Sequence, residues 1–497
     1  MIKNYKLAAL AALFIVFALP MAQAQNQVPM PEVNTDSLMK HIIELSSETY
    51  AGRMAGSNGY DKAARYVERL LRRYGARPVR QEFRVECNEV ENCKFNVYRP
   101  GSKEKRVFTL GNEFCCAGMT GRGYVDAQMV FCGYGIDNGA FDEFKKVDVQ
   151  GKIAVVLTGL PEEGIVAGNI AEHYATLRDK ARAAEKHGAI GLMAVNVSNS
   201  CRADEPQGRV YCGELPHLTT FPILHLTLDC AREIFKDELM PIDSAISQIA
   251  RHRKPCSFAL LKKAEIDVNA FYRPTATTTN VVGMLPGTDS RISDELIVIG
   301  TSLDGVGMQG ETCLFPGADI NASGVAAVLE VARLLSKPSY RPKRSVVFVL
   351  FSGSEQQYLG SRVFLENYAK LRKIEAFLNV QNIGCGDSII LYGDNRYPTL
   401  TDIAINRDSI PGRHNIMRNE EKTNPRGDAK AFDVIGIPSM VFTTHNGMQH
   451  NRVSSDIWEN IDRRILTLTS QLLIETTCEL GEGLYQGRSP RSRAFRF

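Results

Sequence analysis

The chain has 497 residues, of which 59 are Lys or Arg and 56 are Asp or Glu, so its formal net charge is +3 at pH 7. This near balance argues against nucleic acid as a partner, because nucleic-acid-binding domains concentrate positive charge. The length is sufficient for two or three domains with a substantial core.

The first 24 residues have the pattern of a secretory signal peptide. Lys3 and Lys6 precede an apolar run from Leu7 to Leu19, and Ala22-Gln23-Ala24 forms an Ala-x-Ala cleavage site. We therefore expect an exported protein, periplasmic, in the cell envelope or extracellular, whose fold begins near Gln25. No other stretch reaches the roughly 18 apolar residues that a membrane span needs, so we expect no membrane-spanning segment.

The chain contains 12 cysteines, and export permits them to form disulfides. Two pairs of cysteines are close in sequence and flanked by loop-like residues, and we predict these as disulfides: Cys87–Cys93 and Cys201–Cys212. The adjacent Cys115 and Cys116 are not expected to bond each other. No Cys-x-x-Cys motif is present, which argues against a thiolate zinc site.

The segment from Val33 to Gly75 has a helical pattern. Ser57 precedes an amphipathic stripe with apolar residues at helical spacing, and Gly75 is placed to end that helix. From 107 to 263 the strands are shorter and glycines more frequent, which indicates a small β-rich module. We therefore predict three parts after the signal peptide: a discontinuous α/β domain of 25–106 and 264–480, an insert of 107–263, and a basic flexible tail of 481–497.

The stretch from Leu296 to Gly360 reads strand, loop, helix, strand, loop. The run Leu296–Gly300 and the run Ser345–Phe351 are apolar without polar alternation, as expected for parallel strands covered on both faces. In such sheets the chemistry lies at the carboxyl ends of the strands. Five polar residues would fall at that edge: Ser302, Asp304, Asp319, Ser354 and Glu355.

Several separated motifs resemble one family. In this order, six segments are similar to the aminopeptidase Y-type di-zinc exopeptidases, peptidase family M28: Tyr50–Ser57, Gly317–Gly324, Phe351–Ser361, Leu378–Gly384, Gln449-His450 and Ser455–Asp462. This group also contains bacterial leucyl aminopeptidases and glutamate carboxypeptidase. The resemblance implies a zinc exopeptidase fold, α/β with a mostly parallel mixed sheet flanked by helices. The insert resembles a protease-associated domain, with the recurring phrase Val147–Ile153.

The resemblance also implies a metal site. The family holds two zinc ions with five protein ligands, and a Glu just before the ligand Glu is the general base. Matched position by position, the bridging Asp is Asp319, the ligand Glu is Glu355 and the terminal His is His450. Two carboxylates and one imidazole with an open position form a plausible shell for one zinc ion.

The remaining family positions are substituted. Ser302 stands where the second metal has its His, Gln381 where it has its Asp, and Ser354 where the general base should be. In the family, the residue at the position of Asp304 orients this His by a hydrogen bond, and here Asp304 has no His to orient. Loss of a positioned general base typically costs about 10²–10⁴ in rate, and loss of one metal removes half of the clamp that activates water. Ordinary di-zinc aminopeptidase activity is therefore not expected.

Three functions remain open. The first is a pseudo-peptidase that binds protein or peptide in the cell envelope. Its partner in this case could be a protein complex of the envelope. The second is a single-zinc enzyme similar to glutaminyl cyclases, relatives that use one zinc held by Asp, Glu and His. The third is an active metallo-exopeptidase with relocated groups, for which the candidates are Glu311, Cys313 and His445.

Each candidate residue also has a purely structural interpretation. Asp319 can bond backbone amides, Glu355 can pair with an Arg, and His450 can be a hydrogen-bonded core residue. Glu311 can be a solvated charge on a loop, and Cys313 can be a packed or disulfide-linked thiol. His445 can be a hydrogen-bonded loop residue. Ser302, Ser354 and Gln381 are predicted to bond one another and close the vacated half-site. A serine-hydrolase role for Ser354 is rejected, because its surroundings lack the Gly-x-Ser-x-Gly pattern.

Overall fold

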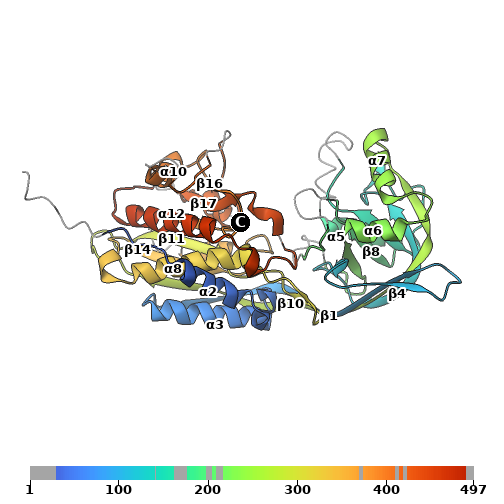
Figure 1. Ribbon diagram of the computed structural model, residues 1–497, viewed down its shortest axis with the longest axis horizontal. Helices are drawn as coiled ribbons and strands as arrows, with labels where there is room; N and C mark the ends of the chain where they lie inside the picture. The colour runs from blue at the N-terminus through green and yellow to red at the C-terminus, as the bar shows by residue number, and fades with distance from the viewer. Residues whose placement is uncertain are drawn as a thin grey trace, which may run out of the picture.

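The computed structural model describes residues 29–139, 141–161, 176–197, 204–208, 216–368, 373–408, 413–417, 422–450 and 452–487. Two lobes lie side by side along the long axis of the molecule (Figure 1). Three features predicted from the sequence fall outside the described residues: the signal peptide 1–24, residues 488–497 of the tail, and the Cys201–Cys212 pair. Among the described residues, no helix has the length and apolar character to cross a membrane.

The larger lobe is built on a mixed, mostly parallel sheet, as predicted. Its strands run in the order β16 (Ser388–Tyr392), β17 (Ser439–His445), β15 (Lys373–Val380), β11 (Glu295–Ser302), β14 (Ser345–Phe351) and β10 (Ser257–Leu285). The four central strands are parallel, whereas β16 and β10 are antiparallel to their neighbours. Parallel neighbours bring their carboxyl ends to one edge, which places the polar residues after β11 and β14 together.

Helices cover both faces of this sheet. Along β11, Ile297 and Ile299 enter one hydrophobic cluster while Leu296 and Val298 enter another, because successive strand residues face opposite sides. The first cluster is covered by α2 (Thr35–Leu45), α3 (Asn58–Arg73), α8 (Gly324–Leu335), α10 (Pro398–Ile405) and α12 (Arg463–Gly481). The second is covered by α9 (Leu359–Tyr368) and α11 (Asp428–Val434). Two-sided cover explains the unbroken apolar runs.

The smaller lobe has its own core. Its strands are β2 (Lys105–Phe108), β3 (Phe114–Cys116), β4 (Gly123–Cys132), β7 (Ile153–Leu157), β8 (Gly191–Val195) and β9 (Ile223–Leu226), with a separate hairpin of β5 (Asp137–Asn138) and β6 (Phe141–Asp142). Its helices are α5 (Leu177–Lys186), α6 (Leu228–Phe235) and α7 (Ile242–His252). Two hydrophobic clusters lie within this lobe, separate from those of the larger one.

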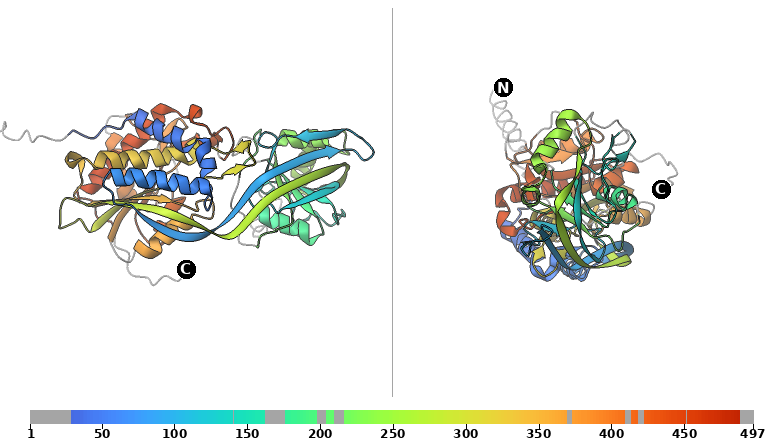
Figure 2. Two further views of the ribbon diagram at one scale, coloured as in Figure 1. Left: turned by 90° about the horizontal axis from the view of Figure 1, so that it is seen from below. Right: turned by 90° about the vertical axis from the view of Figure 1, so that its right-hand side faces the viewer.

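Two long antiparallel strands, β1 (Val79–Tyr98) and β10, run through both lobes (Figure 2). Their pairing shifts register where Val85 opposes Ala276 and Cys87 opposes Arg273, which leaves Pro274 and Thr275 unpaired. Proline lacks a backbone N–H, so a register break is where a strand tolerates it. The chain therefore passes between lobes near Cys87 and Arg273, and the predicted insert limits, 107 and 263, fall inside the smaller lobe.

The predicted Cys87–Cys93 disulfide is wrong, because strand β1 holds the two thiols too far apart to bond. The two cysteines lie on the continuous strand β1, where six residues span about 20 Å. Cys87 packs with Met54 and Val85, whereas Cys93 belongs to the core of the smaller lobe. Closeness in sequence suggested a loop, but the strand holds the thiols apart.

Candidate functional site

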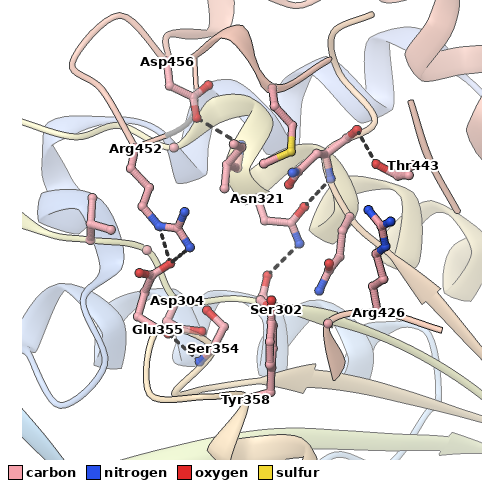
Figure 3. A pocket seen from close by; sticks show the side chains of 18 of the residues that line it. Ser302, Asp304, Asn321, Ser354, Glu355, Tyr358, Arg426, Thr443, Arg452 and Asp456 are labelled. Atoms are coloured by element: carbon pink, nitrogen blue, oxygen red, sulfur yellow. Dashed lines mark hydrogen bonds and ion pairs between the residues drawn. The ribbon is translucent and has the colours of Figure 1, made fainter. Parts of the chain in front are cut away.

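A cavity of about 250 Å³ lies at the carboxyl ends of the central strands of the larger lobe (Figure 3). Ser302 and Asp304 reach it from β11, Ser354 and Glu355 from β14, Gln381 and Asn382 from β15, and Thr443 and Thr444 from β17. Apolar side chains complete its walls, among them Val306, Phe315, Ile320 and Met448. The edge predicted from the sequence is therefore the edge with the cavity.

Glu355 is paired with Arg452 in this cavity. Nε and Nη2 of Arg452 each lie 2.7 Å from Oε1 of Glu355, and only 11% of the Glu355 side chain is exposed (Figure 3). A guanidinium forms strong, charge-assisted bonds to carboxylates. The charge that a metal would need from Glu355 is thus already compensated, as in the structural interpretation of this residue.

Asp319 is fully buried and does not line the cavity; its neighbour Ile320 does. Oδ1 of Asp319 accepts hydrogen bonds from the Gly384 amide at 2.6 Å and from Ser323 Oγ at 3.2 Å, whereas its Oδ2 has no hydrogen-bond partner. Burial, and then the nearby carboxylate of Asp456, raise the pKa of Asp319. The contact with a backbone amide matches the structural interpretation of Asp319.

His450 lies outside the cavity lining. Its Nδ1 is 3.0 Å from Ser455 Oγ, and Ser455 Oγ donates a 2.8 Å hydrogen bond to Glu205 of the smaller lobe. Within the ranges given above, no group of three or more His, Cys, Asp or Glu side chains is arranged to hold a metal ion. The structure therefore does not bring Asp319, Glu355 and His450 together, and in this arrangement the donor set does not fit zinc.

Ser302 and Gln381 converge on a carboxylate that the sequence analysis missed. Ser302 Oγ and Gln381 Nε2 both donate to Oδ2 of Asp428, at 3.1 and 3.3 Å. Asp428 is fully buried at the start of α11, and burial raises its pKa to about 6. Ser302 and Gln381 are therefore linked through Asp428. An acidic residue at a helix start is common, so the sequence carries no signal for this role.

Asp304 forms the second part of the polar floor. Its Oδ2 accepts a 2.9 Å hydrogen bond from the backbone N–H of Ser354, and its side chain is buried. Burial, followed by the charge of Glu355, raises the pKa of Asp304 to about 7. Ser354 thus lies beside Asp304, apart from Ser302 and Gln381, which departs from the prediction that the three substituted residues bond one another.

Asn321, Arg426 and Asp456 are further cavity residues that the sequence analysis missed. Asn321 donates to the Ser302 carbonyl at 3.1 Å and accepts from the Asn382 amide at 3.1 Å, and so joins β11 to β15. Arg426 stacks over the ring of Tyr392, with Cζ 4.2 Å from the centroid. Asp456 accepts from the amides of Asp319 and Ile320 at 2.7 and 3.0 Å.

The relocation candidates do not line the cavity. Glu311 is exposed between β12 (Met308–Gln309) and β13 (Cys313–Leu314), and Cys313 is buried. His445 Nδ1 lies 3.0 Å from Asp387 at the molecular surface. These placements agree with the structural interpretation of each residue.

Comparison with curated proteins supports one family. A family model described as Peptidase family M28 matches residues 280–477. A probable zinc metalloprotease of Pyrenophora teres f. teres is 33% identical over 112 residues, which are 21% of this chain and 23% of that protein. Human transferrin receptor protein 2 is 26% identical over 185 residues, 35% of this chain and 21% of that protein. The matches span about a quarter of the length of these relatives.

Solved structures share the fold over almost the whole chain. An aminopeptidase from Aneurinibacillus sp. strain AM-1 has a TM-score of 0.63 at 21% identity, covering 93% of this chain and 97% of that one. A zinc aminopeptidase from Bacillus subtilis has a TM-score of 0.62 at 18% identity, covering 91% and 96%. Residues 280–477 thus match the model of peptidase family M28, and the two aminopeptidases share the fold of almost the whole chain.

Proposed function

We propose that this protein is an exported member of the peptidase family that binds peptide or protein in the cell envelope and does not hydrolyse it. The observation that carries this proposal is the pairing of Glu355 with Arg452, at 2.7 Å from both Nε and Nη2. Because Arg452 compensates the charge of Glu355, this carboxylate does not attract a metal cation. Its guanidinium stays protonated at any physiological pH.

The substituted positions support the same conclusion. Ser354 has neither the charge nor the basicity of a general base, and such a base typically contributes about 10²–10⁴ in rate. Ser302 and Gln381 donate their hydrogen bonds to Asp428, so these side chains are engaged in the floor of the cavity. Hydrolysis would require both a general base and an activated water, and Ser354 cannot act as that base.

The cavity retains the chemistry of a binding site. Amide and hydroxyl groups from Asn382 and Thr443 provide donors and acceptors, and Tyr358, Phe315 and Met448 provide apolar surface. Fixed polar groups that orient a ligand beside apolar surface that buries it are features of ligand sites. Transferrin receptor protein 2, a relative named for a protein that it binds, also favours a binding role.

A single-zinc enzyme, similar to a glutaminyl cyclase, is the second candidate. Oδ2 of Asp319 is buried without a hydrogen-bond donor, which favours a proton or a cation beside it. The family relatives are named zinc metalloprotease and zinc aminopeptidase. One zinc ion, or the two of an active metallo-exopeptidase, would require Glu355 to exchange Arg452 for metal.

Metal content and turnover separate these candidates. The purified protein is incubated with zinc, washed exhaustively and analysed by elemental analysis, and its hydrolysis of a panel of aminoacyl-4-nitroanilides is measured. We expect less than 0.1 zinc per chain and no turnover above the blank. One zinc per chain that is lost in Asp319→Ala would establish the second candidate, and two zinc ions with turnover would establish an active peptidase.

Binding is measured on the same preparation. A mixture of casein-derived peptides is added, and bound peptides are recovered by ultrafiltration and identified by mass spectrometry. Thr443→Trp fills the cavity and is expected to abolish retention, whereas the matched control Thr219→Trp, at an exposed site of the smaller lobe, is expected to keep it. Equal retention by both variants would contradict peptide binding in this cavity.

A further inference from the structure

The sheet of the smaller lobe curls until its first and last strands face each other. Strand β10 is antiparallel to both β1 and β4, strands β4, β7, β8 and β9 are parallel, and β3 is antiparallel to β9. Strand β3 is therefore antiparallel to β1. The rings of Phe95 on β1 and Phe114 on β3 meet edge to face, with centroids 5.3 Å apart.

This contact determines which residues oppose each other across the seam between β1 and β3. Cys93 lies two residues before Phe95, and Cys116 lies two residues after Phe114, so each cysteine shares the strand face of its aromatic neighbour. Between antiparallel strands, a step back along one corresponds to a step forward along the other. Cys93 and Cys116 are consequently opposite each other in one buried cluster, and burial, followed by the neighbouring Cys93 thiol, raises the pKa of Cys116.

The neighbouring cysteine faces the other way. Because side chains alternate between the two faces of a strand, Cys115 points away from this cluster. Its Sγ donates a hydrogen bond to the carbonyl of Gln207 at 3.3 Å. The adjacent pair thus offers one thiol, Cys116, to the seam. Cys313 on β13 is also near Cys116, but it belongs to the cluster of Cys115 and Phe315.

The seam lacks the backbone ladder that joins the other strands. Among the paired strands of the described chain, β1 and β3 are not paired with each other. The side-chain amide of Gln309 takes the place of a strand, since it accepts from the Cys116 N–H and donates to the Cys116 carbonyl, both at 2.7 Å. Gln309 in turn opposes Val90 of β1. A covalent link at this point would close the sheet of the smaller lobe.

We propose that Cys93 and Cys116, both free thiols in the structure, become a disulfide in the exported protein. The thiolate of Cys93 attacks an external disulfide, either glutathione disulfide or the disulfide of a dithiol oxidase, and a mixed disulfide forms. The thiolate of Cys116 then displaces the carrier. The Cys93–Cys116 bond forms, and the oxidant leaves as two thiols, which carry the two electrons and the two protons of the cysteine thiols. Since both thiols are buried in the folded chain, exchange precedes the docking of β3.

The link also bears on the cavity of the larger lobe. Gln309 lies in the segment between Val306 and Phe315, two residues that line the cavity. Holding β3 against Gln309 therefore fixes one wall of the candidate binding site. This inference concerns the smaller lobe and is independent of whether the cavity binds peptide.

Peptide mapping tests the pairing. The full-length protein is unfolded, refolded in a glutathione redox buffer, alkylated without reduction, and digested with trypsin and a glutamate-specific protease. We expect fragments 92–94 and 114–122 to be recovered as one disulfide-linked species in the wild type and in Cys115→Ser. The species is expected to be absent from Cys116→Ser. Alkylation of Cys93 and Cys116 in the wild type, linkage of either to Cys313, or a link that survives Cys116→Ser would overturn the proposal.

Thermal unfolding before and after reduction provides a second test. A disulfide that closes a loop of about two dozen residues is expected to raise the midpoint by roughly 6 to 12 °C for a lobe of this size. Reduction with a phosphine should lower the midpoint by this amount in the wild type and in Cys87→Ser, whose thiol lies outside the seam. An unchanged midpoint on reduction would count against the link.

Discussion

The guanidinium of Arg452 lies against the carboxylate of Glu355 at the carboxyl end of β14, with Nε and Nη2 both 2.7 Å from Oε1. Nearby, Oδ1 of Asp304 is unbonded, and the buried guanidinium of Arg53 interacts electrostatically with Asp304 and with Asp456. Arg452 is the cation that pairs directly with Glu355. The following predictions test the site and the fold that holds it.

Arg452→Met should destabilise the protein. It leaves Glu355 as a largely buried charge without its partner, and because 30% of the Arg452 side chain is exposed we expect a loss of about 1 kcal/mol, smaller than for a fully buried pair. The measurement is urea unfolding at pH 7. The control is Arg426→Met, which removes an arginine stacked on Tyr392 but no carboxylate partner. Equal losses in the two variants would contradict the assigned importance of the pair.

Asp428→Ala should lower the free energy of unfolding by more than Arg452→Met does. It leaves Ser302 Oγ and Gln381 Nε2 without their buried acceptor, and a buried donor without a partner costs about 1–3 kcal/mol. The free energy of unfolding is again measured in urea, with the exposed Asp402→Ala in α10 as control. A loss below that of Asp402→Ala would show that the network adds nothing to stability.

Installing the missing groups should not create a peptidase. In Ser302→His with Ser354→Glu, the cavity regains a histidine and a base, but Glu355 remains paired with Arg452 and Asp319 remains turned toward the Gly384 amide. We expect no turnover of aminoacyl-4-nitroanilides with added zinc, provided that thermal unfolding shows a folded variant. Measurable hydrolysis would mean that the natural residues Ser302 and Ser354 alone account for the absence of activity.

Glu143 should make stability depend on pH. It is buried in the smaller lobe, where desolvation raises its pKa from 4.5 to about 8, against a backbone hydrogen bond from Ile136. Between these values the folded state holds a proton that the unfolded state has released, so stability falls as pH rises from 5 to 7.5. The limit for one such group is about 1.4 kcal/mol per pH unit.

Glu143→Gln should flatten that decline, as measured by urea unfolding at several pH values. Lys180, whose pKa burial lowers to about 8, acts only above this window. Asp304 and Asp428 remain in both proteins and contribute equally, so the difference between the two slopes belongs to Glu143. The control is the exposed Glu366→Gln. A slope in Glu143→Gln as steep as in the wild type would refute the prediction.

Much of the fold was predictable because patterns of neighbouring residues in the sequence determine its helices and strands. The apolar runs of β11 and β14, without polar alternation, indicate strands covered on both sides, and the structure places helices on both faces. Ser57 caps α3 through a bond from the Tyr60 amide, and Gly75, with φ +76°, follows its end, as the sequence predicts. The register break at Pro274 was not predicted, because it depends on how two strands far apart in sequence pair.

The candidate site was predictable only in part. The sequence by itself, through its resemblance to the family, predicts that Ser302, Ser354 and Gln381 replace a ligand, the base and another ligand, because this inference needs only residue identity. Where the remaining side chains point was decided by the tertiary structure. Asp319 faces Gly384, Glu355 meets Arg452, and Asp428 lies beneath Ser302. Contacts between residues a hundred positions apart leave no local pattern, so only packing of the sheet edge specifies them.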